Sequence, residues 1–140
     1  NQTDIAAGAR LCIEAGSDAF AVINTVMGMA IDIENRKPFI GFNQGGLSGP
    51  AIKPIALLNV HQVYQVCKPH RIPIIGQGGI TSANDAIEFF LAGASAIGVG
   101  TGLFYDPLLC PKMNAGIMDY LQRHRMHNVM DLVGKLQLNK

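Results

Sequence analysis

Two glycine-rich segments in the second half of the sequence contain the residue types that bind phosphate through the backbone. They are Gly76-Gln-Gly-Gly79 and Gly98-Val-Gly-Thr-Gly102, and each accompanies the end of a short apolar run. Glycine lets backbone N–H groups approach an anion closely and adopt positive φ, and a helix that begins just beyond adds a favourable dipole. Either cluster alone could equally be turn glycines, but two in succession favour a phosphate site.

Polar side chains beside other apolar runs add candidates for the same site. A third cluster, Gly45-Gly-Leu-Ser-Gly-Pro50, could bring the Ser48 hydroxyl and the Gly49 amide to the same ligand. Asn24 and Thr25 directly follow an apolar run, and an adjacent amide and hydroxyl suit a planar ligand with carbonyl and N–H edges. Asn24 could equally just end its strand, as Asn often does.

The remaining reactive side chains provide neither a convincing acid or base nor a metal site. His124 and His127 lie three residues apart without a third ligand, so no metal binding is expected. Cys12, Cys67 and Cys110 are odd in number and widely spaced, which argues against disulfides and zinc. A reducing cytoplasm is the natural location for such a chain.

Charged residues are scattered along the chain and exclude two classes of partner. The 11 basic and 10 acidic residues form no run of like charge, so neither nucleic acid nor a membrane surface is expected as a partner. Lys53 and Lys112, beside prolines near helix starts, are expected to be solvated, and His61 and His70 to lie on helix surfaces.

No apolar run approaches the roughly 20 residues that cross a bilayer. The start at Asn1, without methionine, suggests a processed or cut product.

The glycine clusters are positioned by a repeated helix-to-strand unit. Residues 14–23 and 91–100 share an Ala-Gly start, and in each copy an amphipathic stretch ends at a glycine before a short apolar strand. A third unit combines a helix with Pro54 in its first turn and a strand over 72–75. Ser82 forms a capping-box pattern with Asp85 ahead of the last helix. The helix of the third unit is indicated by Ile52, Ile55, Leu58, Val63 and Val66.

Short apolar strands separated by helices predict an α/β fold with a parallel sheet covered by helices. The 49% hydrophobic content is enough for the core of one domain. A doubly wound fold is disfavoured, because neither glycine pair has the third glycine of the dinucleotide fingerprint. Three strands cannot close an eight-stranded barrel, so residues 1–140 are expected to form one partial domain of about three βα units. Residues 26–48 are predicted to be an inserted β-hairpin.

Four segments, in this order, resemble dihydroorotate dehydrogenases, most closely those of class 1B. They are Ile23-Asn-Thr-Val-Met-Gly-Met29, Gly45-Gly-Leu-Ser-Gly-Pro-Ala-Ile-Lys-Pro54, Pro73-Ile-Ile-Gly-Gln-Gly-Gly79 and Ala92-Gly-Ala-Ser-Ala-Ile-Gly-Val-Gly-Thr101. The resemblance implies the C-terminal half of a (β/α)₈ TIM barrel, with FMN at the carboxyl ends of the strands. It also implies oxidation of dihydroorotate to orotate in pyrimidine biosynthesis, in which a base removes a proton and a hydride passes to FMN.

The resemblance also assigns roles to particular residues. The family's FMN contacts fall on Ile23, Gly49, Gly78, Gly79, Gly100 and Thr101. Its substrate contacts fall on Asn24 and Thr25. The family's flavin-contacting lysine and its catalytic cysteine loop match positions upstream of Asn1, so no catalytic residue is assigned and this chain alone is expected to be inactive. Gln77 stands where the family usually has an apolar residue.

The resemblance also implies partners for this chain, and two alternative functions remain open. The implied partners are the N-terminal half of the barrel, a second copy in a homo-oligomer and, in class 1B, an electron-transfer subunit with FAD and an iron–sulfur cluster. One alternative is another FMN barrel acting on pyrimidines, of the dihydropyrimidine dehydrogenase type. The other is a non-catalytic half-barrel that binds phosphate or only assembles with a partner half, since open sheet edges favour association.

Overall fold

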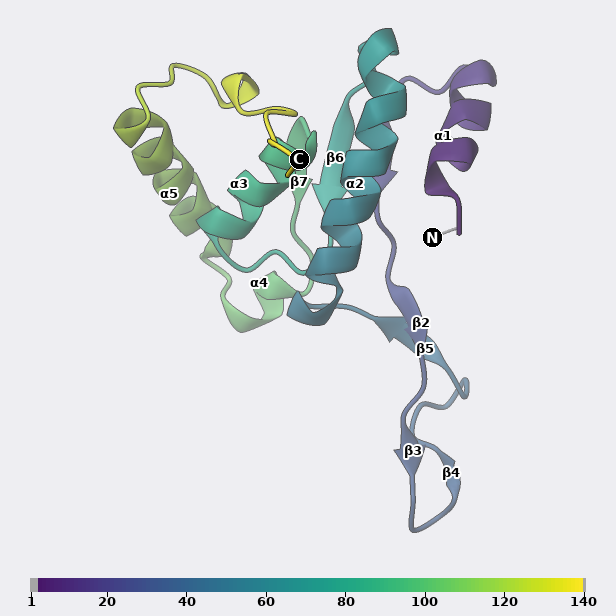
Figure 1. Cartoon of the computed structure of the whole chain (residues 1–140). Helices are drawn as coiled ribbons and strands as arrows, with labels where there is room; N and C mark the ends of the chain where they lie inside the picture. Colours follow the sequence, from purple (N-terminus) through teal and green to yellow (C-terminus); the bar gives the residue numbers. More distant parts are fainter. Residues whose placement is uncertain (1–2, 140) are drawn as a thin grey trace.

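A parallel three-stranded sheet lies at the centre of the computed structural model, which describes residues 3–139. Its strands are β1 (Phe20–Val22), β6 (Ile74–Gln77) and β7 (Ala96–Gly98), in the order β1-β6-β7. Each strand follows a helix along the chain. The helices lie mainly to one side of the sheet, α2 across β6 and β1 and α3 across β6 and β7 (Figure 1). This arrangement confirms the mixed α/β fold that the sequence predicts.

The helices begin and end at residues that the sequence marks. Asp4 caps the first helix, because its side chain accepts a hydrogen bond from the Ala7 amide at 2.8 Å. Pro54 lies in the first turn of the second, where its missing N–H costs nothing. The helices are α1 (Ile5–Glu14), α2 (Lys53–Cys67), α3 (Ala83–Ala92), α4 (Gly102–Tyr105) and α5 (Leu109–Arg123), with 3₁₀ turns at Pro50–Ile52, Lys68–His70 and Val129–Asp131. None of the described helices is long and apolar enough to cross a membrane.

The repeated glycines occupy backbone conformations that other residues rarely adopt. Gly16 follows α1 with φ +92° and Gly93 ends α3 with φ +122°. Gly93 also packs against the ring of Tyr64, where any side chain would overlap the aromatic carbons. The repeat in the sequence therefore encodes the same helix-ending turn twice.

The two faces of the parallel sheet have different environments. On the helix side, Ile74 of β6 is 1% exposed and packs with Phe89 of α3 in the main core. On the other side, the strand register places Ala21, Ile75 and Ala96 in one row, and Ile75 is 41% exposed. An eight-stranded barrel would fill this second face with its interior side chains. The open face therefore fits a fragment of such a barrel.

The predicted middle helix is confirmed as α2, although two of the residues that indicated it lie on its exposed side. Residues spaced three and four apart along the helix are buried, namely Ala56, Val60, Val63 and Cys67. Ile55 and Leu58 are instead about half exposed, at 47% and 58%. Apolar residues lie on both the buried and the exposed sides of this helix, so its composition does not show which side meets the sheet.

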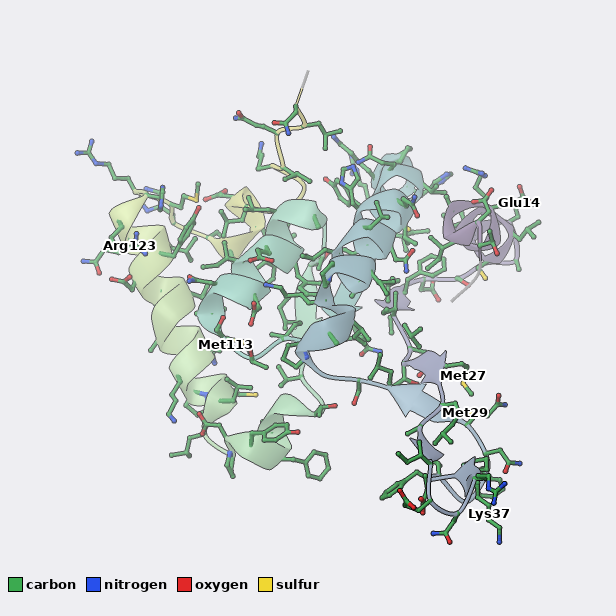
Figure 2. The ribbon with its side chains drawn as sticks, turned by 60° about the horizontal axis from the view of Figure 1, so that its bottom comes forward. Glu14, Met27, Met29, Lys37, Met113 and Arg123 are labelled. Carbon is green, nitrogen blue, oxygen red and sulfur yellow. The ribbon has the colours of Figure 1, made fainter. Side chains whose placement is uncertain are left out.

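Residues 26–47 form an arm that extends away from the sheet (Figure 1). At its base, β2 (Val26–Gly28) pairs with β5 (Gly45–Leu47), and further out β3 (Ile31–Asp32) pairs with β4 (Lys37–Pro38), both antiparallel. Figure 2 shows Met27 and Met29 along the arm, with Lys37 near its far end. Several large apolar side chains of the arm are exposed: Met27, Met29, Ile31, Ile33, Phe39, Phe42 and Leu47. The predicted hairpin segment thus contains two antiparallel strand pairs.

Candidate functional site

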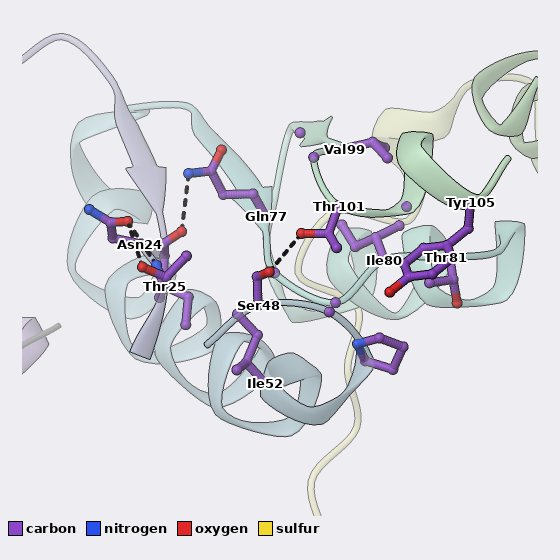
Figure 3. Close-up of a pocket in the computed structure, with 18 residues that line it drawn as sticks. Asn24, Thr25, Ser48, Ile52, Gln77, Ile80, Thr81, Val99, Thr101 and Tyr105 are labelled. Atoms are coloured by element: carbon purple, nitrogen blue, oxygen red, sulfur yellow. Dashed lines mark hydrogen bonds between the residues drawn. The ribbon is translucent and has the colours of Figure 1, made fainter. Parts of the chain in front are cut away.

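A cavity of about 250 Å³ lies where the carboxyl ends of the three parallel strands meet (Figure 3). Its walls come from the segments that follow β1, β6 and β7, and from the segment that follows β5. Every residue predicted to contact a ligand lines this cavity: Ile23, Asn24, Thr25, Gly49, Gly78, Gly79, Gly100 and Thr101. The two strand-end glycine clusters therefore face one common space, as their placement in the sequence predicts.

Hydrogen bonds join segments of the cavity wall that are distant in the sequence. Thr101 Oγ1 donates to Ser48 Oγ at 2.8 Å, which connects the segment after β7 to the one after β5. Gln77 Nε2 donates to the backbone carbonyl of Ile23 at 3.1 Å, which connects β6 to the end of β1 (Figure 3). The sequence analysis assigns Gln77 no role in the site. The signal for such a role is that this glutamine stands where the family usually has an apolar residue.

Other lining residues also went unnoticed in the sequence. Thr81 and Tyr105 both line the cavity, Thr81 just before α3 and Tyr105 at the end of α4. Thr81 directly precedes the predicted cap Ser82, which could have drawn attention to it. Tyr105 has no sequence signal beyond its closeness to the last glycine cluster.

The glycines of the cavity wall serve two different structural purposes. Gly79 has φ +75°, and a Cβ there would lie 2.7 Å from the Gly49 carbonyl oxygen and 3.0 Å from the Lys53 amide nitrogen. Gly78 has φ +130°, and its Cβ would lie 2.8 Å from that of Ala56. At Gly100, in contrast, a Cβ would meet no atom within 4 Å. Gly78 and Gly79 are therefore required for the packing of the wall itself, whereas Gly100 leaves open space beside it.

No side chain that lines the cavity, within the described residues, carries a charge. The polar groups on the cavity wall are backbone amides and the side chains of Asn24, Thr25, Ser48, Gln77, Thr101 and Tyr105, whereas the Thr81 hydroxyl donates to Asp85. The N-terminus of α3, expected to add a favourable dipole, already has the Asp85 carboxylate in its first turn. Anion binding here therefore depends on neutral donors.

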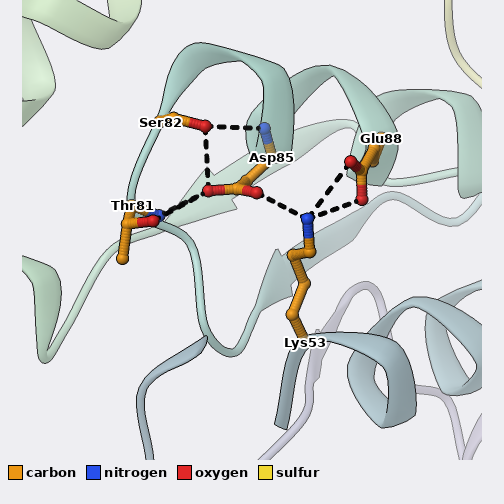
Figure 4. A network of polar contacts seen from close by, with 5 residues as sticks. All are labelled: Lys53, Thr81, Ser82, Asp85 and Glu88. Atoms are coloured by element: carbon orange, nitrogen blue, oxygen red, sulfur yellow. Dashed lines mark hydrogen bonds and ion pairs between the residues drawn. The ribbon is translucent and has the colours of Figure 1, made fainter. Parts of the chain in front are cut away.

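A buried carboxylate, that of Asp85, is bonded to the wall residue Thr81 and to Lys53 (Figure 4). Asp85 is 8% exposed, and its Oδ1 accepts a hydrogen bond from Lys53 Nζ at 2.6 Å. Its Oδ2 accepts from the Thr81 amide at 2.9 Å, the Thr81 hydroxyl at 3.0 Å and the Ser82 hydroxyl at 2.9 Å. Lys53 Nζ also lies 3.0 Å from Glu88 Oε2. The prediction that Lys53 is solvated is therefore wrong, because two carboxylates bind its ammonium group.

These contacts shift the pKa values of both partners. Burial raises the pKa of Asp85, but hydrogen bonds from Lys53, Thr81 and Ser82 outweigh it and lower the pKa to about 2. The hydrogen bond to Asp85 raises the pKa of Lys53 above its ordinary value. Both groups are consequently charged at neutral pH.

The lowered pKa of Asp85 predicts an acid-dependent loss of stability. A carboxylate whose pKa falls from 3.8 to about 2 on folding stabilises the fold by about 2 kcal/mol at neutral pH. This contribution is complete above about pH 5, about half lost at pH 3 and absent well below pH 2. Urea unfolding of the full-length protein should show a gap between wild type and Asp85→Asn that is constant from pH 8 to 5 and shrinks below pH 4.

The control for this experiment is Asp119→Asn. Asp119 Oδ2 forms an exposed ion pair with Arg123 at 2.9 Å, so its loss should change the unfolding free energy by less than about 0.5 kcal/mol at each pH. A gap for Asp85→Asn that stays constant or widens down to pH 3 would contradict the assignment.

The remaining sequence candidates lie apart from the cavity. The His124 ring stacks on that of Tyr120 with centroids 4.1 Å apart, and residues 3–139 contain no group of three metal-binding side chains. Cys67 is buried, which raises its thiol pKa, and Cys12 is exposed. Lys112 is exposed and pairs with Asp106 at 2.7 Å. None of these residues lines the cavity.

The family model described as "Dihydroorotate dehydrogenase" matches residues 1–121 of the chain. The chain belongs to the dihydroorotate dehydrogenase family. The match includes all four strand-end segments that line the cavity. The helix α5 ends just beyond it, at Arg123.

Curated relatives in this family are catalytic subunits of dihydroorotate dehydrogenase B (NAD(+)). The protein from Geotalea daltonii is 49% identical over 99% of this chain, and that from Caldicellulosiruptor saccharolyticus is 51% identical over 99%. The chain spans 44% and 45% of the length of these two relatives.

Solved structures of the family have the same backbone arrangement. Two structures of dihydroorotate dehydrogenase from Eimeria tenella, one ligand-free and one in complex with ferulenol, superpose with TM-scores of 0.80 and 0.79. Both are 28% identical and cover 96% of this chain, which spans 37% and 36% of theirs. The dihydroorotate dehydrogenase fold therefore includes the sheet, the helices and the strand-end segments described here.

Proposed function

We propose that this chain is the C-terminal, FMN-binding part of a dihydroorotate dehydrogenase that oxidises dihydroorotate to orotate in pyrimidine biosynthesis. It contributes three βα units and the inserted hairpin of residues 26–48 to a (β/α)₈ barrel. The observation that carries the proposal is the convergence of four family segments, distant in the sequence, on one cavity at the strand ends. In barrel enzymes, that end holds the active site.

The residues around the cavity suit the phosphate end of FMN. Gly49, Gly78, Gly79, Gly100 and Thr101 would hold the phosphate through backbone amides and one hydroxyl, and Ile23 would contact the flavin. The cavity of about 250 Å³ is smaller than the roughly 300–1,000 Å³ of complete ligand sites. The remaining contacts then come from the other half of the barrel. Bound flavin supplies the hydride acceptor, and this chain supplies binding and orientation.

Asn24 and Thr25 are proposed to bind the substrate. Asn24 Oδ1 accepts a hydrogen bond from the Thr25 amide at 2.8 Å, so the two side chains are held together at the end of β1. Thr25 also packs on Gly46 at the base of the arm, where any side chain would overlap it. An amide and a hydroxyl fixed in this way match the carbonyl and N–H edges of a dihydropyrimidine.

The partners of the chain follow from the same proposal. The open sheet face, with Ile75 in its row, would be covered by the N-terminal half of the barrel. The names of the relatives specify a catalytic subunit and NAD(+), which supports a separate subunit that passes electrons to NAD. We expect that subunit to contain the FAD and the iron–sulfur cluster that the resemblance to class 1B implies. We expect a homo-oligomer in the cytoplasm.

Anaerobic mixing of the full-length protein with one reductant at a time tests the function. Dihydroorotate should bleach the bound FMN within seconds, whereas dihydrouracil should leave it oxidised. Bleaching by dihydrouracil alone would favour an enzyme of the dihydropyrimidine dehydrogenase type. A protein that binds inorganic phosphate but not FMN would support the non-catalytic alternative.

Replacing Asn24 by alanine should impair the reaction while leaving FMN content unchanged. Loss of one hydrogen bond to a buried ligand group costs about 1 to 3 kcal/mol, so kcat/KM for dihydroorotate should fall about 10- to 100-fold. Steady-state kinetics with dihydroorotate measures this, and the absorbance ratio of flavin to protein measures FMN content. Asn114→Ala, at an exposed position of α5, is the matched control and should leave both values unchanged. Unaltered kinetics in Asn24→Ala would remove this residue from the substrate site.

A further inference from the structure

We propose that Lys53 and Asp85 are positioning residues for the phosphate end of FMN, because their ion pair fixes the distance between two segments of the cavity wall. The segments are residues 48–53 and 78–82, and we call the ion pair with its hydrogen bonds to Thr81 and Ser82 the clamp. This inference rests on the proposed function, since it concerns how the same cavity binds FMN.

A single carboxylate joins the two segments. Oδ1 of Asp85 is bonded to Lys53, which lies just after the wall residues Gly49 and Pro50. Oδ2 is bonded to the amide and hydroxyl of Thr81, which itself lines the cavity. The side chain of Asp85 is fixed by these contacts and by its burial. A displacement of either segment would therefore break a charge-assisted hydrogen bond.

Ile52 and Ile80 anchor the two segments in the core, and the clamp adds a polar contact between the segments near their glycines. The segments meet through backbone: the position of a Gly79 Cβ lies 2.7 Å from the Gly49 carbonyl oxygen and 3.0 Å from the Lys53 amide nitrogen. Two glycines in contact have no side chains that could interlock. The spacing between the Gly49 and Gly79 amides consequently depends on contacts made by neighbouring side chains, among them the clamp, whose residues are shown in Figure 4.

Lys53 supports the wall and is not itself a phosphate ligand. Its ammonium group lies 2.6 Å from Asp85 and 3.0 Å from Glu88, and its side chain is 25% exposed. The three side chains carry one positive and two negative charges, a net charge of −1, which would repel a phosphate rather than attract it. The effect of the clamp on FMN is therefore geometric.

The comparison of FMN with riboflavin separates this role from a general structural one, because riboflavin lacks the phosphate. Full-length apoprotein would be titrated with each flavin by fluorescence quenching, for wild type, Lys53→Met and Asp85→Asn. We expect each substitution to raise the Kd for FMN at least about tenfold, as for loss of a charged hydrogen bond, and to change the Kd for riboflavin less than twofold. Lys112→Met, which breaks the exposed ion pair with Asp106, should change neither.

Each other outcome has a distinct meaning. An unchanged preference for FMN over riboflavin in Lys53→Met, or an equal loss of both flavins, would overturn the clamp. If Asp85→Asn does not fold, Lys53→Met together with Lys53→Arg decides the question, since arginine keeps the charge and should restore most of the FMN preference. Wild-type protein without a preference for FMN would overturn the proposed function, and the clamp with it.

Discussion

Alanine at position 79 is expected to lower the affinity for FMN at least about 100-fold and to destabilise the fold by about 2 to 4 kcal/mol. Two costs combine at this position. Gly79 has φ +75°, a conformation that costs an alanine about 1 to 2 kcal/mol. The new methyl group would also lie 2.7 Å from the Gly49 carbonyl oxygen, and backbone atoms cannot rotate away as a side chain can. The segments must separate, which would displace the Gly49 and Gly79 amides that are proposed to bind the phosphate.

FMN titration of the full-length apoprotein and urea unfolding measure the two effects of Gly79→Ala. The matched control is Gly16→Ala, because Gly16 also has positive φ, at +92°, but its Cβ would meet no atom within 4 Å. Gly16 lies after α1, outside the cavity, so its variant reports the backbone cost alone, about 1 to 2 kcal/mol, with unchanged FMN affinity. Two outcomes would contradict this prediction: Gly79→Ala is destabilised no more than Gly16→Ala, or it binds FMN as tightly as the wild type. Either would mean that the backbone contact between residues 48–53 and 78–82 is not required.

The features that could be predicted from sequence are those encoded by a few neighbouring residues. Ser82 accepts a hydrogen bond from the Asp85 amide at 3.2 Å, as a cap three residues ahead of it should. Asn128 and Asp131 likewise form a capping box within four neighbouring residues. The glycine clusters could be placed at strand ends for the same reason, because strand, glycine turn and helix follow each other without interruption in the sequence. Parallel strands then bring their carboxyl ends to one edge, so the common cavity followed from local patterns.

The clamp could not be predicted, because its partners are distant along the chain. Lys53 and Asp85 are 32 residues apart and lie on different helices. In the sequence, Lys53 resembles any lysine at the start of a helix, and Asp85 has a sufficient local explanation as a capping residue. Their encounter depends on α2 and α3 lying side by side on β6, a tertiary arrangement that neither local pattern specifies.

The ring of Phe89 packs α3 against the sheet, and Phe89→Ala should destabilise the fold by about 3 to 5 kcal/mol. Phe89 is 0% exposed, the largest of the fully buried side chains, and belongs to the core between α3 and β6. Removal of the ring leaves a cavity that the rigid strand and helix cannot close. Urea unfolding of the full-length protein measures the loss. Phe42→Ala is the control: Phe42 is 90% exposed on the arm, and its loss should change stability by less than about 0.5 kcal/mol.

A double-mutant cycle with Gly76 tests whether the ring sets the distance between α3 and the strand that leads into the cavity. A Cβ at Gly76 would lie 2.7 Å from Phe89 Cδ1 and 2.8 Å from Ala94 Cβ, so Gly76→Ala should destabilise the wild type by about 1 to 3 kcal/mol. In the Phe89→Ala background the first of these contacts is absent, and the same change should cost at least about 1 kcal/mol less. The contact with Ala94 remains, so the recovery is partial. Additive costs would mean that the helix shifts toward the strand when the ring is removed, and that the distance is set elsewhere in the core.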